Sequence, residues 1–380
     1  MSSIDILNTK IAANKVLPEG LWLNNRKWDL SIITLSAGLV FLPWGAYELF
    51  NSLLSADSIR RIIGIEIHDI LDFNRNLING LVALLIGGPH MYATFTRTLL
   101  DRDFRKGHLF FLLGSFILPF LVIFFGVVHF QILITFFFFW ASIHIFHQIA
   151  YIVDCYNLKR NKPPSLKYRM LDYIVVFSSL YPMGVWRMVN DDIKIGQIEI
   201  LIPKFIFIHN NPMIGWGLFV VVSAIFLVSL IIWVWRTFWE YANGEAHLPK
   251  FLLIGVTVIV SFFTPMYNEL DVAFQGLNTW HSFQYLGLTW YIYRIQGRKE
   301  GIRTPFVRWL SLGGRIWKFY FFNVGCALGT VVMIGFLLLY KDILGFSFDQ
   351  CYYVVVLSVL LMHYYHDHLL FTKHESIVLS

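Results

Sequence analysis

Residues 132–153 read ILITFFFFWASIHIFHQIAYIV, and this stretch decides the fold class of the chain. It contains no charged side chain and is long enough for a helix to cross a bilayer. A second such run extends from Val220 to Trp235. Strands of a membrane barrel would instead alternate apolar and polar residues, whereas a helix satisfies its own backbone groups in hydrocarbon. The sequence therefore predicts an all-α polytopic transmembrane bundle.

The composition supports a membrane protein. Of the 380 residues, 57% are hydrophobic and 14% are charged, whereas roughly a quarter of a typical soluble domain is charged. One soluble core of this size cannot bury that excess of apolar side chains. The net charge of +6 comes without a basic patch interleaved with aromatics, so we expect no nucleic-acid partner. Residues 1–27 lack the apolar core of a cleavable signal peptide, and we expect none.

The apolar runs predict about ten transmembrane spans. They cover residues 28–50, 77–95, 108–128, 131–153, 171–189, 213–235, 251–267, 270–293, 317–340 and 351–371. If the N-terminus is cytoplasmic, most of the 30 basic residues fall in cytoplasmic segments. The exceptions are Arg60, Arg61, Arg75, Arg187, Lys194, Lys204 and Lys341. Because cytoplasmic loops are enriched in Lys and Arg, the distribution predicts that both termini are cytoplasmic.

This topology divides the chain into three parts. Residues 1–27 form a cytoplasmic segment, residues 28–371 a single transmembrane domain, and residues 372–380 a short cytoplasmic tail. Residues 51–76 mix isoleucines with acidic residues, which predicts an amphipathic helix at the membrane surface. We expect a multi-pass integral membrane protein, placed in the inner membrane if the source is bacterial.

Six histidines fall inside predicted spans. They are His90, His144, His147, His281, His363 and His366. Two pairs are spaced three residues apart, which places both members of a pair near one helix face. At about 1.5 Å per residue, all six lie roughly 10–20 Å from the predicted cytoplasmic edge. A single buried histidine can simply hydrogen-bond to a neighbouring helix, but six at a common depth favour a metal or cofactor site.

Polar neighbours of these histidines complete the candidate site. Asp367 lies four residues after His363 and is a candidate ligand or hydrogen-bond acceptor. Metal-bound imidazoles need a partner for their second nitrogen. The candidates for that role, at helical spacing from a histidine, are Gln148, Tyr151 and Gln284. Gly87-Gly88-Pro89 predicts a kink or break beside His90.

Imidazoles with one carboxylate suit iron, zinc or copper better than magnesium or calcium. Six histidines are more than one metal ion needs, so we expect two iron ions. Such a centre can activate dioxygen, take a membrane lipid or another hydrophobic substrate from the bilayer, and receive electrons from a cytosolic donor steered by the basic loops. The prediction is a metal-dependent membrane oxidoreductase of the oxygenase, hydroxylase or desaturase type.

The style of ligation resembles that of membrane fatty-acid desaturases, hydroxylases and alkane monooxygenases, which carry HxxxH and HxxHH boxes. The present chain has His144–His147 and His363–His366–His368, without an adjacent pair of histidines. The resemblance concerns the type of ligand and assigns no role to a particular residue.

Three other functions fit the same histidines. A membrane haem protein would use them as axial pairs for electron transfer. A zinc-dependent lipid hydrolase would need only about three ligands, such as His281, His363 and His366 with Asp367. A proton-coupled transporter would use them as a relay.

Overall fold

The structure, a computed structural model, describes residues 21–54, 70–160, 163–190, 193–201, 212–298, 301–311 and 316–372. Nearly all of these residues are helical, which confirms the all-α prediction. The described part contains one small hairpin, in which β1 (Lys194–Ile195) pairs antiparallel with β2 (Ile198–Glu199). Its turn includes Gly196, whose φ of 61° suits a residue without a side chain.

Seven described helical segments are long and apolar enough to span a membrane. They are Arg26–Leu53, Ile70–Arg97, Leu109–Val128, Phe130–Leu158, Met213–Ala242, Leu248–Met266 and Ile316–Leu339. Each coincides with one of the ten predicted spans. The first consists of α2 (Arg26–Trp28), η1 (Asp29–Thr34), η2 (Leu35–Val40) and α3 (Phe41–Leu53). The membrane-like character of the bundle is therefore confirmed, while the total of ten spans remains a prediction.

The other three predicted spans are also helical, but one is divided into two short helices and two are less apolar. Residues 171–189 are divided between α11 (Leu166–Ser178) and α12 (Tyr181–Asn190). Residues 270–293 belong to α16 (Leu270–Arg298), and residues 351–371 largely to α20 (Phe348–Leu370). Helices α16 and α20 carry buried histidines and other polar residues. Their lower hydropathy follows from their position inside the bundle, where protein rather than lipid surrounds them.

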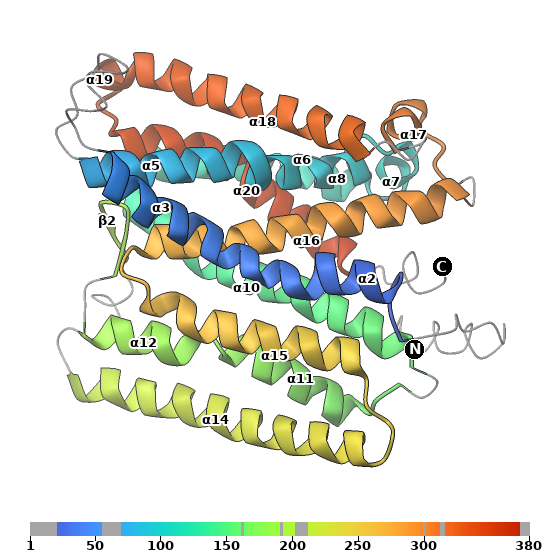
Figure 1. The fold of residues 1–380 in the computed structure, drawn as a ribbon. Coiled ribbons are helices and arrows are strands. Elements are labelled where there is room, and N and C mark those ends of the chain that lie inside the picture. Colours follow the sequence, from blue (N-terminus) through green and yellow to red (C-terminus); the bar gives the residue numbers. More distant parts are fainter. Residues whose placement is uncertain are drawn as a thin grey trace.

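The outer helices have apolar side chains on their outward faces. Phe110 on α8 (Leu109–Ser115) is 88% exposed, Ile231 on α14 (Pro212–Ala242) 66% and Val332 on α18 (Ile316–Leu339) 65%. Figure 1 shows α18 and α14 on opposite sides of the bundle, with α16 and α10 (Phe130–Leu158) between them. Extended exposed apolar surfaces of this kind are typical of contact with lipid or another protein.

The segments predicted to lie on opposite sides of a membrane gather at opposite ends of the bundle. Segments predicted to be cytoplasmic lie at the end that carries α2, α7 (Arg102–Gly107) and α17 (Pro305–Ser311) (Figure 1). The opposite end carries the β hairpin and α19 (Lys341–Leu344). Of the predicted amphipathic helix at 51–76, residues 55–69 lie outside the described part. Its last residues belong to α5 (Ile70–Val82), so the second apolar helix begins before residue 77.

The helix around Gly87-Gly88-Pro89 widens rather than breaks. The π-helix η3 (Ala83–Gly87) leads directly into α6 (Gly88–Arg97). Pro89 has no N–H to offer the carbonyl of Leu85, and the hydroxyl of Tyr320 donates to that carbonyl at 2.6 Å. A Cβ at Gly88 would lie 2.5 Å from the Cβ of Ala327, so glycine lets α6 pack closely against α18. This irregular turn positions the next residue, His90.

Candidate metal site

Four of the six predicted histidines meet at one point inside the bundle. They are His90 on α6, His144 on α10, His281 on α16 and His363 on α20. One ring nitrogen from each lies within 4.8 Å of the others, and all four side chains are buried. The Nε2 atoms of His90 and His281 lie 3.1 Å apart. We call these four residues the four-histidine group.

The backbone fixes the tautomer of His90. Its Nδ1 lies 3.2 Å from the carbonyl oxygen of Gly87, which can only accept a hydrogen bond. Nδ1 therefore carries the hydrogen, and the lone pair is on Nε2, which faces His281. Two imidazole nitrogens 3.1 Å apart repel each other unless a hydrogen or a cation lies between or beside them.

A hydroxyl fixes the tautomer of His363 in the same way. Thr94 Oγ1 donates to Asp367 Oδ1 at 2.8 Å and lies 2.7 Å from His363 Nδ1. Since the hydroxyl has one hydrogen, it accepts from Nδ1, and the lone pair of His363 is on Nε2. Tyr285 donates to the same carboxylate oxygen at 2.7 Å. The second oxygen of Asp367 is left to face the histidines.

Several buried polar atoms in this site have no hydrogen-bond partner. Among the described residues, these include His144 Nε2, His363 Nε2 and Asp367 Oδ2. Asp367 Oδ2 lies 3.6 Å from His363 Nε2 and 3.8 Å from His144 Nε2. Leaving one buried polar atom unsatisfied costs about 1–3 kcal/mol. A metal cation at their centre would satisfy these atoms together, so the residues present fit a metal ion.

His147 and His366 lie outside the four-histidine group. Both ring nitrogens of His366 have partners, because Nδ1 is 3.0 Å from Thr98 Oγ1 and Nε2 is 2.9 Å from Ser115 Oγ. His147 is half-buried, with its ring centroid 5.4 Å from that of His368. Although residues three positions apart lie within about 60° of each other around a helix, only one member of each HxxH pair joins the common centre. The structure thus does not bring the pairs together as units.

The residues predicted to support the histidines have different contacts. Gln148 donates to the backbone carbonyl of His281 at 3.1 Å and to Gln284 Oε1 at 3.2 Å, which ties α10 to α16. Tyr151 packs against Phe371, with ring centroids 5.2 Å apart. The two glutamines therefore connect α10 and α16 around the site, and Tyr151 packs on the ring of Phe371.

The ring nitrogens are held instead by residues that the sequence prediction missed. Thr94 contacts His363, and Ser282 Oγ lies 3.0 Å from His90 Nδ1. Both contacts connect different helices. A partial signal was present, because Thr94 lies four residues after His90 and Tyr285 four residues after His281. Polar side chains at helical spacing on the same spans would have marked them.

One cation lies near the carboxylate side of the site. The positive charge of Arg97, the last residue of α6, acts on the Asp367 carboxyl and on Tyr285. A hydrogen-bonded series thus runs from His363 through Thr94, Asp367 and Tyr285. It leads toward the end of the bundle that carries the basic segments.

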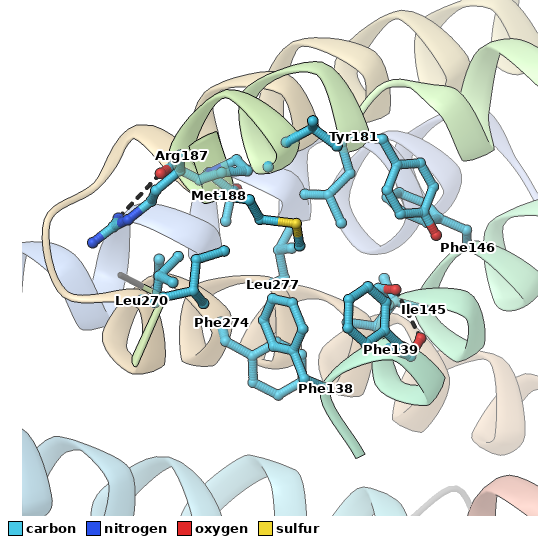
Figure 2. A pocket seen from close by; sticks show the side chains of 18 residues that line it. Phe138, Phe139, Ile145, Phe146, Tyr181, Arg187, Met188, Leu270, Phe274 and Leu277 are labelled. Carbon is cyan, nitrogen blue, oxygen red and sulfur yellow. Dashed lines mark hydrogen bonds between the residues drawn. The ribbon is translucent and has the colours of Figure 1, made fainter. Parts of the chain in front are cut away.

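An apolar cavity of about 60 Å³ lies near the site, between α10, α12 and α16. Figure 2 shows Phe138, Phe146, Met188 and Leu277 around it. Leu277 precedes His281 by about one turn of α16, but the lining residues include none of the four histidines. Its predominantly apolar lining is typical of sites for small hydrophobic molecules.

Comparison of the chain with protein-family models, curated proteins and solved structures found no match.

Proposed function

We propose that this chain is a membrane-embedded metalloenzyme that holds iron between the four-histidine group and Asp367 and oxidises a lipid or another hydrophobic substrate. The observation that carries the proposal is the set of buried polar atoms without hydrogen-bond partners. The Nε2 atoms of His144 and His363 and Oδ2 of Asp367 converge with the facing nitrogens of His90 and His281. Unsatisfied polar atoms of this kind are rare unless they bind something.

The donor atoms favour a transition metal. Neutral imidazoles suit iron, zinc and copper, whereas magnesium and calcium prefer oxygen ligands. We propose one ion rather than the two expected from the sequence, because His366 is already hydrogen-bonded to two hydroxyls and His147 lies elsewhere. Zinc is the second candidate, and with it a lipid hydrolase.

A haem is the weaker candidate at this position. The ring centroids of His90 and His363 are 4.2 Å apart, and those of His144 and His363 are 5.1 Å apart. The imidazoles touch one another directly, and this packing leaves no space for a porphyrin plane between two axial rings. Haem binding would require the four helices to move apart.

We propose that the chain crosses the membrane ten times, with both termini in the cytoplasm, as a multi-pass protein of the inner membrane if the source is bacterial. The distribution of Lys and Arg supports this orientation. The arrangement of the helix ends also supports it, because segments rich in basic residues gather at one end of the bundle (Figure 1). Helices α16 and α20 would then be spans shielded from lipid by their neighbours.

Iron bound at this site would supply dioxygen activation and one-electron transfer. In a hydroxylation, a substrate C–H becomes C–OH, the second oxygen atom leaves as water, and a cytosolic donor supplies two electrons with two protons. The hydroxyl of Tyr285 donates a hydrogen bond to Asp367 Oδ1, and the positive charge of Arg97 acts on this carboxyl group. We assign to this series the delivery of protons from the cytoplasmic end.

The test compares lipids extracted from cells that express the wild type, His281→Ala or His366→Gln, with equal amounts of protein in the membrane. The wild type and His366→Gln should both produce a lipid that has gained an oxygen atom or lost two hydrogens, only when dioxygen is present. His281→Ala should not. Equal amounts of oxidised product with His281→Ala would refute the proposal, and a hydrolysed product independent of dioxygen would favour the zinc hydrolase.

A further inference from the structure

A hollow of about 40 Å³ lies beside the four-histidine group, between α6, α16 and α20, and none of the four histidines lines it. Two of its lining residues contact ligand side chains. The carbonyl of Gly87 accepts from His90 Nδ1 at 3.2 Å. The ring of Tyr364 stacks on that of His144, with centroids 4.0 Å apart. A molecule in this inner hollow would therefore be one side chain away from the candidate metal site.

A second hollow, of about 140 Å³, lies between α5, α18 and α20. Two of its lining residues, Val331 on α18 and Phe348 at the start of α20, are 39% and 44% exposed. They belong to the apolar outer surface that includes Val332. This outer hollow therefore reaches the surface that we propose faces lipid.

The two hollows share a wall. The residues that line both are Ala83, Gly88, Met91, Tyr352, Tyr353 and Val356. Met91 has a flexible side chain that adapts to its surroundings, and Val356 stands on α20 between the two spaces. The two hollows are therefore adjacent, and movement of the side chains between them would join them into one route from the outer surface toward the histidines.

The chemistry of the walls changes along this route. The outer hollow is bounded by apolar residues such as Ala327 and Ile334, and by Asn76, Asn79 and Asp349 at one end. Asn79 Nδ2 donates to Asp271 at 3.2 Å, so its amide is oriented and Oδ1 is the free acceptor. Asn79 is buried, and this Oδ1 has no hydrogen-bond partner among the described residues. It is placed to accept from an O–H or N–H group of a ligand.

We propose that this route admits the substrate of the metal site sideways from the bilayer, and that the substrate is a long hydrocarbon chain whose polar end carries an O–H donor. The proposal rests on the proposed function. The polar end hydrogen-bonds to Asn79 Oδ1, and the chain extends past Val356 toward the four-histidine group. Eleven residues separate Asn79 from His90, about 16 Å along the helix. Oxidation would therefore fall well inside the chain, away from the polar end.

The test uses a long-chain fatty alcohol that carries a photoreactive diazirine near the end of its chain and an alkyne tag, with the full-length protein in lipid nanodiscs. Labelled peptides are mapped by mass spectrometry. We expect labels on α6 and α20. Val356→Trp fills the shared wall and should reduce this labelling roughly tenfold, about 1.4 kcal/mol. Val332→Trp, the same change on the outer surface of α18, should leave it unchanged.

Asn79→Leu provides a second variant. It should weaken labelling by the alcohol but not by a hydrocarbon probe of equal length without the hydroxyl. A monoacylglycerol probe with the same chain, used in parallel, distinguishes a free alcohol from a lipid head group as the source of the donor. Unchanged labelling in Val356→Trp, or labels confined to the cavity around Phe138 and Met188 (Figure 2), would overturn the proposal.

The metal content of each sample is measured separately. Labelling of α6 and α20 in protein that binds no metal would support the route and refute the metal site. Stoichiometric metal without such labelling would refute the route and leave the metal site standing.

Discussion

The hydroxyl of Thr94 is the contact on which the orientation of His363 depends, and Thr94→Val removes it with little change of shape. Oγ1 lies 2.7 Å from His363 Nδ1, 2.6 Å from the Tyr285 hydroxyl and 2.8 Å from Asp367 Oδ1, to which it donates. In the variant, the N–H of His363 loses its acceptor inside the bundle. Asp367 Oδ1 loses one of its two donors.

Two effects of Thr94→Val follow. Losing the hydrogen-bond partner of a metal ligand typically lowers metal affinity about 10–100-fold, which corresponds to about 1.4–2.7 kcal/mol. The free energy of unfolding should also fall, by about 1–3 kcal/mol, because a buried donor is left unsatisfied. Thr94→Ser keeps the hydroxyl and should bind metal nearly as tightly as the wild type.

The assay is competition for iron between the purified variants and a chelator of known affinity. Thr96→Val is the matched control, because Thr96 is buried on the same helix and its hydroxyl contacts Tyr293 at 2.6 Å and the Ala93 carbonyl at 2.7 Å. It should lose stability and keep its iron affinity. Equal affinity in Thr94→Val and the wild type, or equal losses in both valine variants, would refute the reasoning.

Two further predictions concern buried ionisable side chains at the contact of α11, α14 and α15 (Leu248–Phe263). Asp172→Asn removes the carboxylate that lies 3.0 Å from both Arg236 and Lys250. It should lower the free energy of unfolding in detergent by about 3–5 kcal/mol, and a wild-type melting temperature would contradict this. Burial, and then the charges of Lys250 and Arg160, lower the pKa of His247 from 6.5 to about 3. The unfolded chain therefore binds more protons than the folded protein between these values, so stability is complete above pH 6.5 and declines as the pH falls below it. His247→Gln should reduce that decline in unfolding measurements from pH 7 to 4, and an identical pH profile would contradict it.

The sequence predicted the outer helices well because they are apolar along their whole length. Helix α14 needs no protein partner for its exposed face, so composition alone identifies it. Helix α16 was also predicted as a span, yet its polar residues make it less apolar than the seven long segments. The length of the segment and the depth of His281 within it were the features of the sequence that predicted this span.

The candidate site was predictable only in part. Depth within the spans singled out His90, His144, His281 and His363, which the structure brings together. It could not exclude His366, because whether a residue faces the bundle centre depends on helix rotation and packing. Contacts such as that between Thr94 and His363 join residues 269 positions apart, and spacing along one helix carries no information about them.

The central claim is that the four-histidine group binds iron, and the most direct measurement is metal content with an optical spectrum of detergent-purified protein from iron-replete cells. We predict about one iron per chain without a Soret band, lost in His144→Ala and His281→Ala and retained in His366→Gln. No stoichiometric metal in the wild type, or full iron content in both alanine variants, would contradict the account.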